Sequence, residues 1–117
     1  MDGSFSGEYV DNDITKFRSG AFYDTKIKKV DCPNAKNISP NLFHLCSELV
    51  EINLPKATSG EVSEYAFYYC VKLKKVNLPL LKQIARYAFS NTNSLEEISL
   101  PSLIKCDSYG FKAASKV

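Results

Sequence analysis

Apolar residues recur along this chain with a period of about 22 residues. Phenylalanine and proline both follow that period, and the gaps between successive members are 21 to 24 residues. The members are Phe22, Phe43, Phe67, Phe89 and Phe111 in one series, and Pro33, Pro55, Pro79 and Pro101 in the other. Because two independent residue types share one period, the sequence predicts an internal structural repeat.

Each repeat contains a short extended segment followed by a turn. In residues 73–79 (LKKVNLP), apolar and polar side chains alternate at the end of the segment, which is typical of a β-strand. Pro79 ends this strand because it has no backbone N–H to donate to a neighbour. Residues 86–94 predict one or two turns of α- or 3₁₀-helix. Residues 80–84 predict a second short extended segment on the opposite side.

A single repeat cannot bury its own apolar face, whereas stacked repeats form a continuous core. We therefore expect the five phenylalanines to form a spine, with a second core column five residues before each of them. That column contains Phe17, Ile38, Val62, Ile84 and Cys106. The chain divides into residues 1–13, an N-terminal cap or half repeat, and residues 14–117, about four and a half repeats of which the last is incomplete.

The third repeat, VSEYAFYYCVKLKKVNLP (62–79), closely resembles the BspA-like family of leucine-rich repeats, and the resemblance extends over residues 9–117. It implies an α/β repeat fold: a right-handed solenoid with short parallel strands on the concave face and short helical turns on the other side. It also implies a non-enzymatic protein-binding or adhesion module of a bacterial cell-surface or secreted protein, located at the cell surface or outside the cell. A structural or receptor-contacting module of a bacteriophage particle is the alternative.

The composition narrows the possible partners. Apolar residues make up 44% and charged residues 24% of the chain, which is typical of a globular protein. The net charge of +2 is too small to predict a nucleic-acid partner. No apolar run approaches the ~18 residues of a membrane span, and the acidic, polar start does not resemble a secretory signal. The sequence also predicts no cofactor and no metal site, because it lacks the spacing of any known ligand set.

The four cysteines fall in repeat columns. Cys32 and Cys106 occupy positions that other repeats fill with aliphatic residues, so both are expected in the core. Cys46 and Cys70 share one column in adjacent repeats, where parallel strands ~4.8 Å apart would bring them toward disulfide range. Free cysteine is among the most buried residue types, so buried free thiols are the favoured interpretation.

Two columns of the predicted strands face outward and contain the first candidates for partner contact. One column alternates in charge and the next is polar; the first reads Lys29, Glu51, Lys75 and Glu97, and the second Asp31, Asn53, Asn77 and Ser99. The alternation indicates either a patterned binding face or cross-strand charge pairing, and we favour pairing. Lys75, Asn77, Glu97 and Ser99 are the candidate contact residues on this face.

Tyrosines supply the remaining candidates. Tyr65, Tyr87 and Tyr109 each precede a core phenylalanine by two residues and are expected to stack as a half-buried ladder. Tyr68 and Tyr69 do not repeat, and because tyrosine is enriched at recognition surfaces they are the stronger candidates for partner contact. The expected partner is a protein, either on a host surface or in the chain's own assembly. The open C-terminal repeat is a further candidate for self-association.

Overall fold

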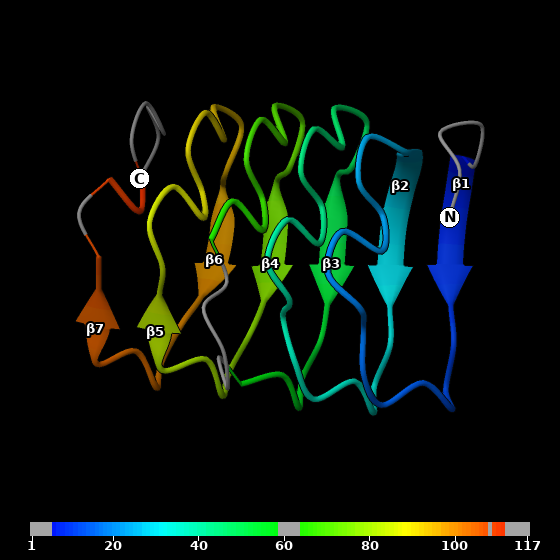
Figure 1. The fold of residues 1–117 in the computed structure, drawn as a ribbon, viewed down its shortest axis with the longest axis horizontal. Coiled ribbons are helices and arrows are strands. Elements are labelled where there is room, and N and C mark those ends of the chain that lie inside the picture. Colours follow the sequence, from blue (N-terminus) through cyan, green and yellow to red (C-terminus); the bar gives the residue numbers. More distant parts are fainter. Residues whose placement is uncertain (1–5, 59–63, 108, 112–117) are drawn as a thin grey trace.

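The computed structural model describes residues 6–58, 64–107 and 109–111, and within them the chain forms a solenoid of parallel strands (Figure 1). Five strands form one sheet in the order β1-β2-β3-β4-β6. Their bounds are β1 Ser6–Val10, β2 Lys26–Asp31, β3 Glu51–Asn53, β4 Lys75–Asn77 and β6 Glu97–Ser99. A second sheet pairs β5 (Gln83–Ile84) with β7 (Lys105–Cys106), which run in the opposite direction to the first sheet in Figure 1.

The strands of the large sheet are aligned one repeat apart. Val30 pairs with Ile52, Ile52 with Val76, and Val76 with Ile98. Val30, Ile52 and Val76 are buried, whereas the residues directly before and after each of them in the strand remain partly or fully exposed. Tyr9 of β1 pairs with Val30, so residues 6–10 contribute a strand to the same stack. The register predicted from the repeat is therefore confirmed.

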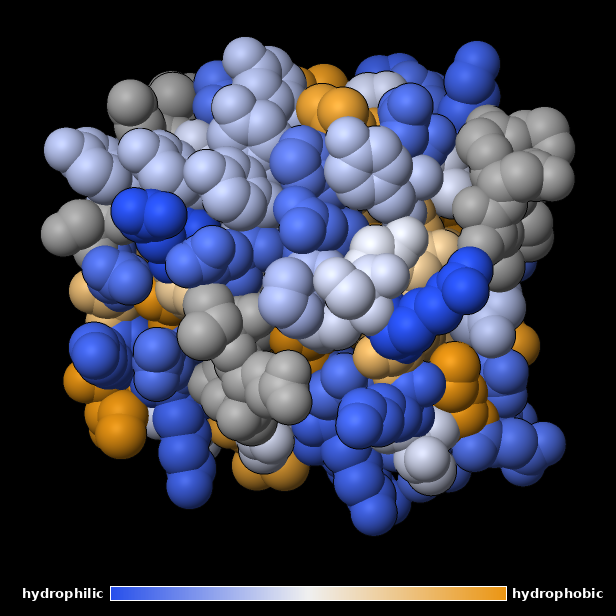
Figure 2. Space-filling model, viewed as in Figure 1, coloured by the Kyte–Doolittle hydropathy of each residue, from blue (hydrophilic) through white to orange (hydrophobic). Residues whose placement is uncertain are grey.

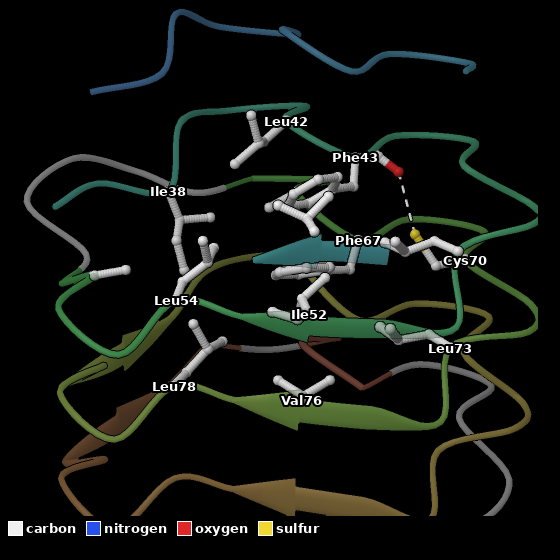
Figure 3. Close-up of a cluster of buried hydrophobic side chains, with 14 of the residues drawn as sticks. Ile38, Leu42, Phe43, Ile52, Leu54, Phe67, Cys70, Leu73, Val76 and Leu78 are labelled. Atoms are coloured by element: carbon white, nitrogen blue, oxygen red, sulfur yellow. Dashed lines mark hydrogen bonds between the residues drawn. The ribbon is translucent and has the colours of Figure 1, made fainter. Parts of the chain in front are cut away.

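Phenylalanine rings stack through the centre of the solenoid. Successive ring centroids from Phe22 to Phe111 lie 4.7–5.4 Å apart, and the rings are within 24° of parallel. Figure 3 shows Phe43 and Phe67 lying over each other, with aliphatic side chains of the strands around them. Phe17 packs edge-on against Phe22 at 5.8 Å. The predicted spine is confirmed, and four of its five members are at most 2% exposed.

The predicted helical turns are wrong, because the described residues contain no helix. The residues two before and two after Phe22, Phe43, Phe67 and Phe89 have positive φ, for example Tyr65 (57°) and Tyr69 (61°) around Phe67. A right-handed helix cannot contain such residues. Alternate amides of this segment donate to the next repeat instead of to their own turn: Phe67 N–H donates to Ala88 at 2.7 Å.

These inter-repeat bonds recur around Phe22, Phe43 and Phe67. In each case the amides two before, at and two after the phenylalanine donate to a carbonyl one repeat further on. Around Phe43, for instance, Asn41 donates to Glu64 at 2.9 Å and Leu45 to Tyr68 at 2.8 Å. The turn side is thus a second hydrogen-bonded ladder, while the amides between these donors, such as that of Cys46 to Phe43 at 3.1 Å, donate within their own turn.

The second core column is confirmed only in part. Phe17, Ile38 and Ile84 are at most 2% exposed, and Cys32 in its own column is fully buried. Cys106 is exposed, contrary to the prediction, because it lies in the last described repeat and no further described repeat covers it. The predicted core residue Val62, the N-terminal cap before Ser6 and the incomplete repeat after Phe111 lie outside the described residues.

Shortening a spine residue should destabilise the whole stack. Phe67→Ala removes a ring that contacts Phe43 and Phe89, so the free energy of unfolding should fall by about 3–5 kcal/mol in chemical denaturation. Leu80→Ala is the matched control, since Leu80 is 43% exposed and its loss should change stability by no more than about 0.5 kcal/mol. Equal losses in the two variants would contradict the spine.

The left-handed positions give a second test. Asn91, with φ of 63°, lies two residues after Phe89. Asn91→Val places a β-branched residue where left-handed backbone is strained, so stability should fall by about 1–2 kcal/mol. Asn91→Gly removes the same hydrogen bond from Ser90 Oγ but accepts positive φ, and should be the more stable of the two variants. A more stable valine variant in urea denaturation would argue against this turn geometry.

Candidate protein-binding surfaces

The outward side of the large sheet, here called the strand face, has an alternating column of charge. The register aligns Lys29 with Glu51, Glu51 with Lys75, and Lys75 with Glu97. Lys29 Nζ lies 3.6 Å from Glu51 Oε2, and both side chains are about one-third exposed. Among the described residues this is the only pair in the column within 4.0 Å. Cross-strand pairing is therefore present, but it engages half of the column.

A ladder of amide side chains runs beside the charged column. Asn53 Nδ2 donates to Asp31 Oδ1 at 3.0 Å, and Asn77 Nδ2 donates to Asn53 Oδ1 at 2.6 Å. Ser99 aligns with Asn77 in the next strand. The Asn53 amide therefore donates to Asp31 and accepts from Asn77, which holds these three side chains in one orientation.

The strand face is hollowed into an open groove of about 470 Å³. Four of the six predicted contact residues line it: Lys75, Asn77, Glu97 and Ser99. The structure thus brings these four side chains together, as the column alignment predicts. The other two, Tyr68 and Tyr69, are not among its lining residues and belong to a different surface.

That second surface is an aromatic strip along the turn side of the solenoid. It consists of Tyr23, His44, Tyr65, Tyr68, Tyr69, Tyr87 and Tyr109, with neighbouring ring centroids 4.7–5.7 Å apart. In Figure 2, pale side chains of near-neutral hydropathy gather in a band over the turns that precede the strands. The three stacked tyrosines predicted from the sequence form the regular part of this strip, within 16° of parallel.

His44 and Tyr23 join the strip without having been predicted as contact residues. His44 stacks on Tyr65 at 5.7 Å and meets Tyr23 at 4.9 Å. Burial among these rings lowers the pKa of His44, although the charge of Asp24 partly opposes that shift. The sequence contains a signal for both residues, since each directly follows a spine phenylalanine, in the column that Tyr68 occupies in the third repeat.

Two of the buried thiols form hydrogen bonds with the backbone of the preceding repeat. Cys46 Sγ donates to the carbonyl of Phe22 at 2.9 Å, and Cys70 Sγ donates to that of Phe43 at 3.1 Å (Figure 3). All four cysteines are free, as predicted. Burial raises the pKa of the Cys46 and Cys70 thiols, and it raises the pKa of Cys32 to about 11. The thiols of Cys46 and Cys70 are therefore structural hydrogen-bond donors.

The acidic segment after β1 forms a turn. The Asp11 carboxylate accepts the backbone N–H of Asp13 at 2.9 Å, the Tyr9 hydroxyl at 3.0 Å and the N–H of Ile14 at 3.1 Å. These hydrogen bonds lower the pKa of Asp11. Across the part of the chain that the structure describes, no group of three or more metal-binding side chains is found. Nor do the same residues form a helix with the length and apolar character of a membrane span.

Parallel strands one repeat apart, an outward polar column and a stacked aromatic core define a solenoid protein of the leucine-rich-repeat class. The chain belongs to the BspA-type leucine-rich repeat family, whose model matches it in six copies over residues 9–80 and 60–117. Searches of curated proteins and of solved structures gave no match. Leucine-rich-repeat solenoids are generally non-enzymatic scaffolds for protein–protein interaction.

The exposed cysteine and the three buried cysteines should differ in thiol reactivity. In the native protein, Ellman's reagent should react with Cys106 alone, because the other three thiols are buried and their raised pKa values leave little thiolate. In denaturant without reductant, all four should react. A Cys106→Ser variant is the control and should show no fast-reacting thiol in the native state. Fewer than four thiols in denaturant would indicate a disulfide.

Proposed function

We propose that this chain is a protein-binding module of the adhesion type, from a bacterial cell-surface or secreted protein, and that its aromatic strip contacts the partner. The observation that carries the proposal is the strip itself. Tyr23, Tyr69 and Tyr109 are 41–56% exposed, although they stand beside a core that is almost completely buried. Large, stiff, amphipathic tyrosines of this kind are typical of recognition surfaces.

The rings of the strip pack mainly against one another. The ring contacts of its members are with one another, whereas among the described tyrosines Tyr9 is the one whose ring contacts a spine phenylalanine. Exposed apolar ring surface costs free energy in water, and a partner that covered it would recover about 25 cal/mol per Å². Hydroxyl groups along the strip add hydrogen-bonding groups to the same surface.

The proposed extracellular location rests on the family resemblance, and the thiols are compatible with it. Secreted proteins meet oxidising conditions, where accessible thiols pair or are oxidised. Cys32, Cys46 and Cys70 are buried with raised pKa values, which protects them from that chemistry. Cys106 is the one exposed thiol among the four and would be the first to react.

A capture experiment tests the role of the strip. The chain is immobilised and challenged with a membrane-protein extract of the host, and captured proteins are identified and quantified. Replacing Tyr23 with Ala and Tyr69 with Asn should reduce capture of the specific partner at least about tenfold, since buried interface tyrosines are common hot spots. Asparagine is chosen at position 69 because Tyr69 has positive φ.

Leu80→Ala is the matched control, since it removes an exposed apolar side chain outside the strip. All variants should retain the thermal unfolding transition of the parent chain within a few degrees. Equal capture by the parent and by the tyrosine double variant would contradict the proposed role of the strip. A parallel capture from a bacteriophage lysate tests the alternative, and a partner found only among capsid or tail proteins would replace the adhesion proposal.

A further inference from the structure

We propose that the strand face binds a second copy of this chain, face to face, about a two-fold axis that runs parallel to the strands between β3 and β4. This inference concerns a different surface from the aromatic strip and goes beyond the proposed function. It rests on the order of charges along the sheet. Read in the opposite direction, that order places a negative charge opposite each positive one. The candidate contact residues Lys75 and Glu97 belong to this surface.

Charge alternates in one column of the strand face, from each strand to the next. The lysines of this column lie on β2 and β4, and the glutamates on β3 and β6. The members are Lys29, Glu51, Lys75 and Glu97, and Asp31 adds one negative charge in the neighbouring polar column. Among the described residues neither Lys75 nor Glu97 has an ion partner within 4.0 Å. Both charges are exposed and available to a partner.

A two-fold rotation parallel to the strands reverses the order of the strands and preserves their direction. Placed between β3 and β4, it sets β2 against β6 of the second copy and β3 against β4. Lys29 then faces Glu97 of the second copy, and Glu51 faces Lys75. Each of the four positions in the alternating column thus meets its opposite, whereas Asp31 faces the uncharged Ser99, and the two halves of the interface are identical.

Other positions of the two-fold axis would bring like charges together. If the axis passes through β3, Lys29 faces Lys75 of the second copy and Glu51 faces its own equivalent. If the axis runs along the direction in which the repeats stack, each strand faces itself and Lys29 meets Lys29. Both arrangements are repulsive, so the charges specify the register as well as the partner.

A second sheet fits this face better than an extended peptide does. Columns on the sheet repeat every ~4.8 Å, the spacing of adjacent strands. Residues on one side of an extended peptide repeat every ~6.6–6.8 Å. Over three steps the two spacings differ by about 6 Å, so a peptide laid across the strands would lose the alternation. Another parallel sheet with the same repeat keeps it throughout.

The contact is expected to be weak and sensitive to salt. The paired area spans four strands of three residues, roughly 15 Å by 10 Å, which is below the size of a stable interface. Exposed ion pairs each contribute little and are screened within ~10 Å at 0.1 M salt. The dimer should therefore form at high protein concentration and low ionic strength.

Sedimentation velocity over a range of concentrations tests this dimer, at about 0.01 M and about 0.5 M salt. The parent chain should dimerise at low salt, and the association constant should fall at least about tenfold at high salt. Glu51→Lys and Lys75→Glu should each abolish dimerisation, because each places two like-charge pairs in the symmetric interface. Mixed together, the two variants should associate with each other, since their charges are then complementary.

Two controls separate this interface from effects of net charge or folding. Lys82→Glu makes the same charge change as Lys75→Glu at an exposed site before β5, and it should leave dimerisation intact. The chain with both Glu51→Lys and Lys75→Glu should still dimerise, because opposite charges continue to meet across the interface, although like charges then adjoin within each copy. Thermal unfolding of every variant shows whether it is folded.

Three results would overturn the proposal. A parent chain that stays monomeric at low salt would exclude the dimer. Equal loss of association in the Lys82→Glu and Lys75→Glu variants would assign any association to net charge. Folded Glu51→Lys and Lys75→Glu chains that fail to associate when mixed would exclude this register. None of these results would affect the proposed role of the aromatic strip.

Discussion

The backbone hydrogen bonds between successive repeats set the geometry of this molecule. On one side they form the parallel sheet, and on the other the amides around each phenylalanine donate to the next repeat. Both ladders fix the distance between equivalent residues near 5 Å, so each side chain lies against its counterparts one repeat away. A residue type can therefore fill a column only if it tolerates contact with its equivalent.

The columns satisfy that requirement in four different ways. Phenylalanine and tyrosine rings stack, with Phe67 and Phe89 4.7 Å apart and Tyr65 and Tyr87 5.3 Å apart. An asparagine side chain can donate a hydrogen bond to the asparagine of the neighbouring repeat, as Asn77 does to Asn53. Thiols donate to the backbone of the preceding repeat. Charged side chains repel their own kind, so the charged column alternates in sign along the sheet.

The sequence predicts the columns well because the column is the unit that repeats. The spine, the strand register and the stacked tyrosines all follow from the period, and all are confirmed. The turn conformation could not be predicted from local propensity. Ala88 and Phe89 are compatible with a helix, whereas left-handed backbone at Leu45 or Tyr69 is imposed by bonds to another repeat. A propensity for one residue contains no information about that second repeat.

The candidate surfaces were predicted to different extents for the same reason. The groove residues Lys75, Asn77, Glu97 and Ser99 lie in aligned columns, so their grouping follows from the repeat. Tyr23 and His44 share one column with Tyr68, and His44 also stacks on Tyr65 of a second column. A list of columns does not show which columns are neighbours in space. Cys106 shows the same limit, since its column predicts burial but its place in the last described repeat leaves it exposed.

The two proposed surfaces have a geometric relation that affects how the module would bind. The strip and the groove share no residue, so a partner on one leaves the other accessible. A two-fold axis parallel to the strands preserves strand direction, and the strip lies over the turns that precede the strands. Both strips of the proposed dimer would then lie at the same end of the dimer. Two weak contacts on one surface bind far more tightly than either does alone, which would make weak self-association sufficient for adhesion.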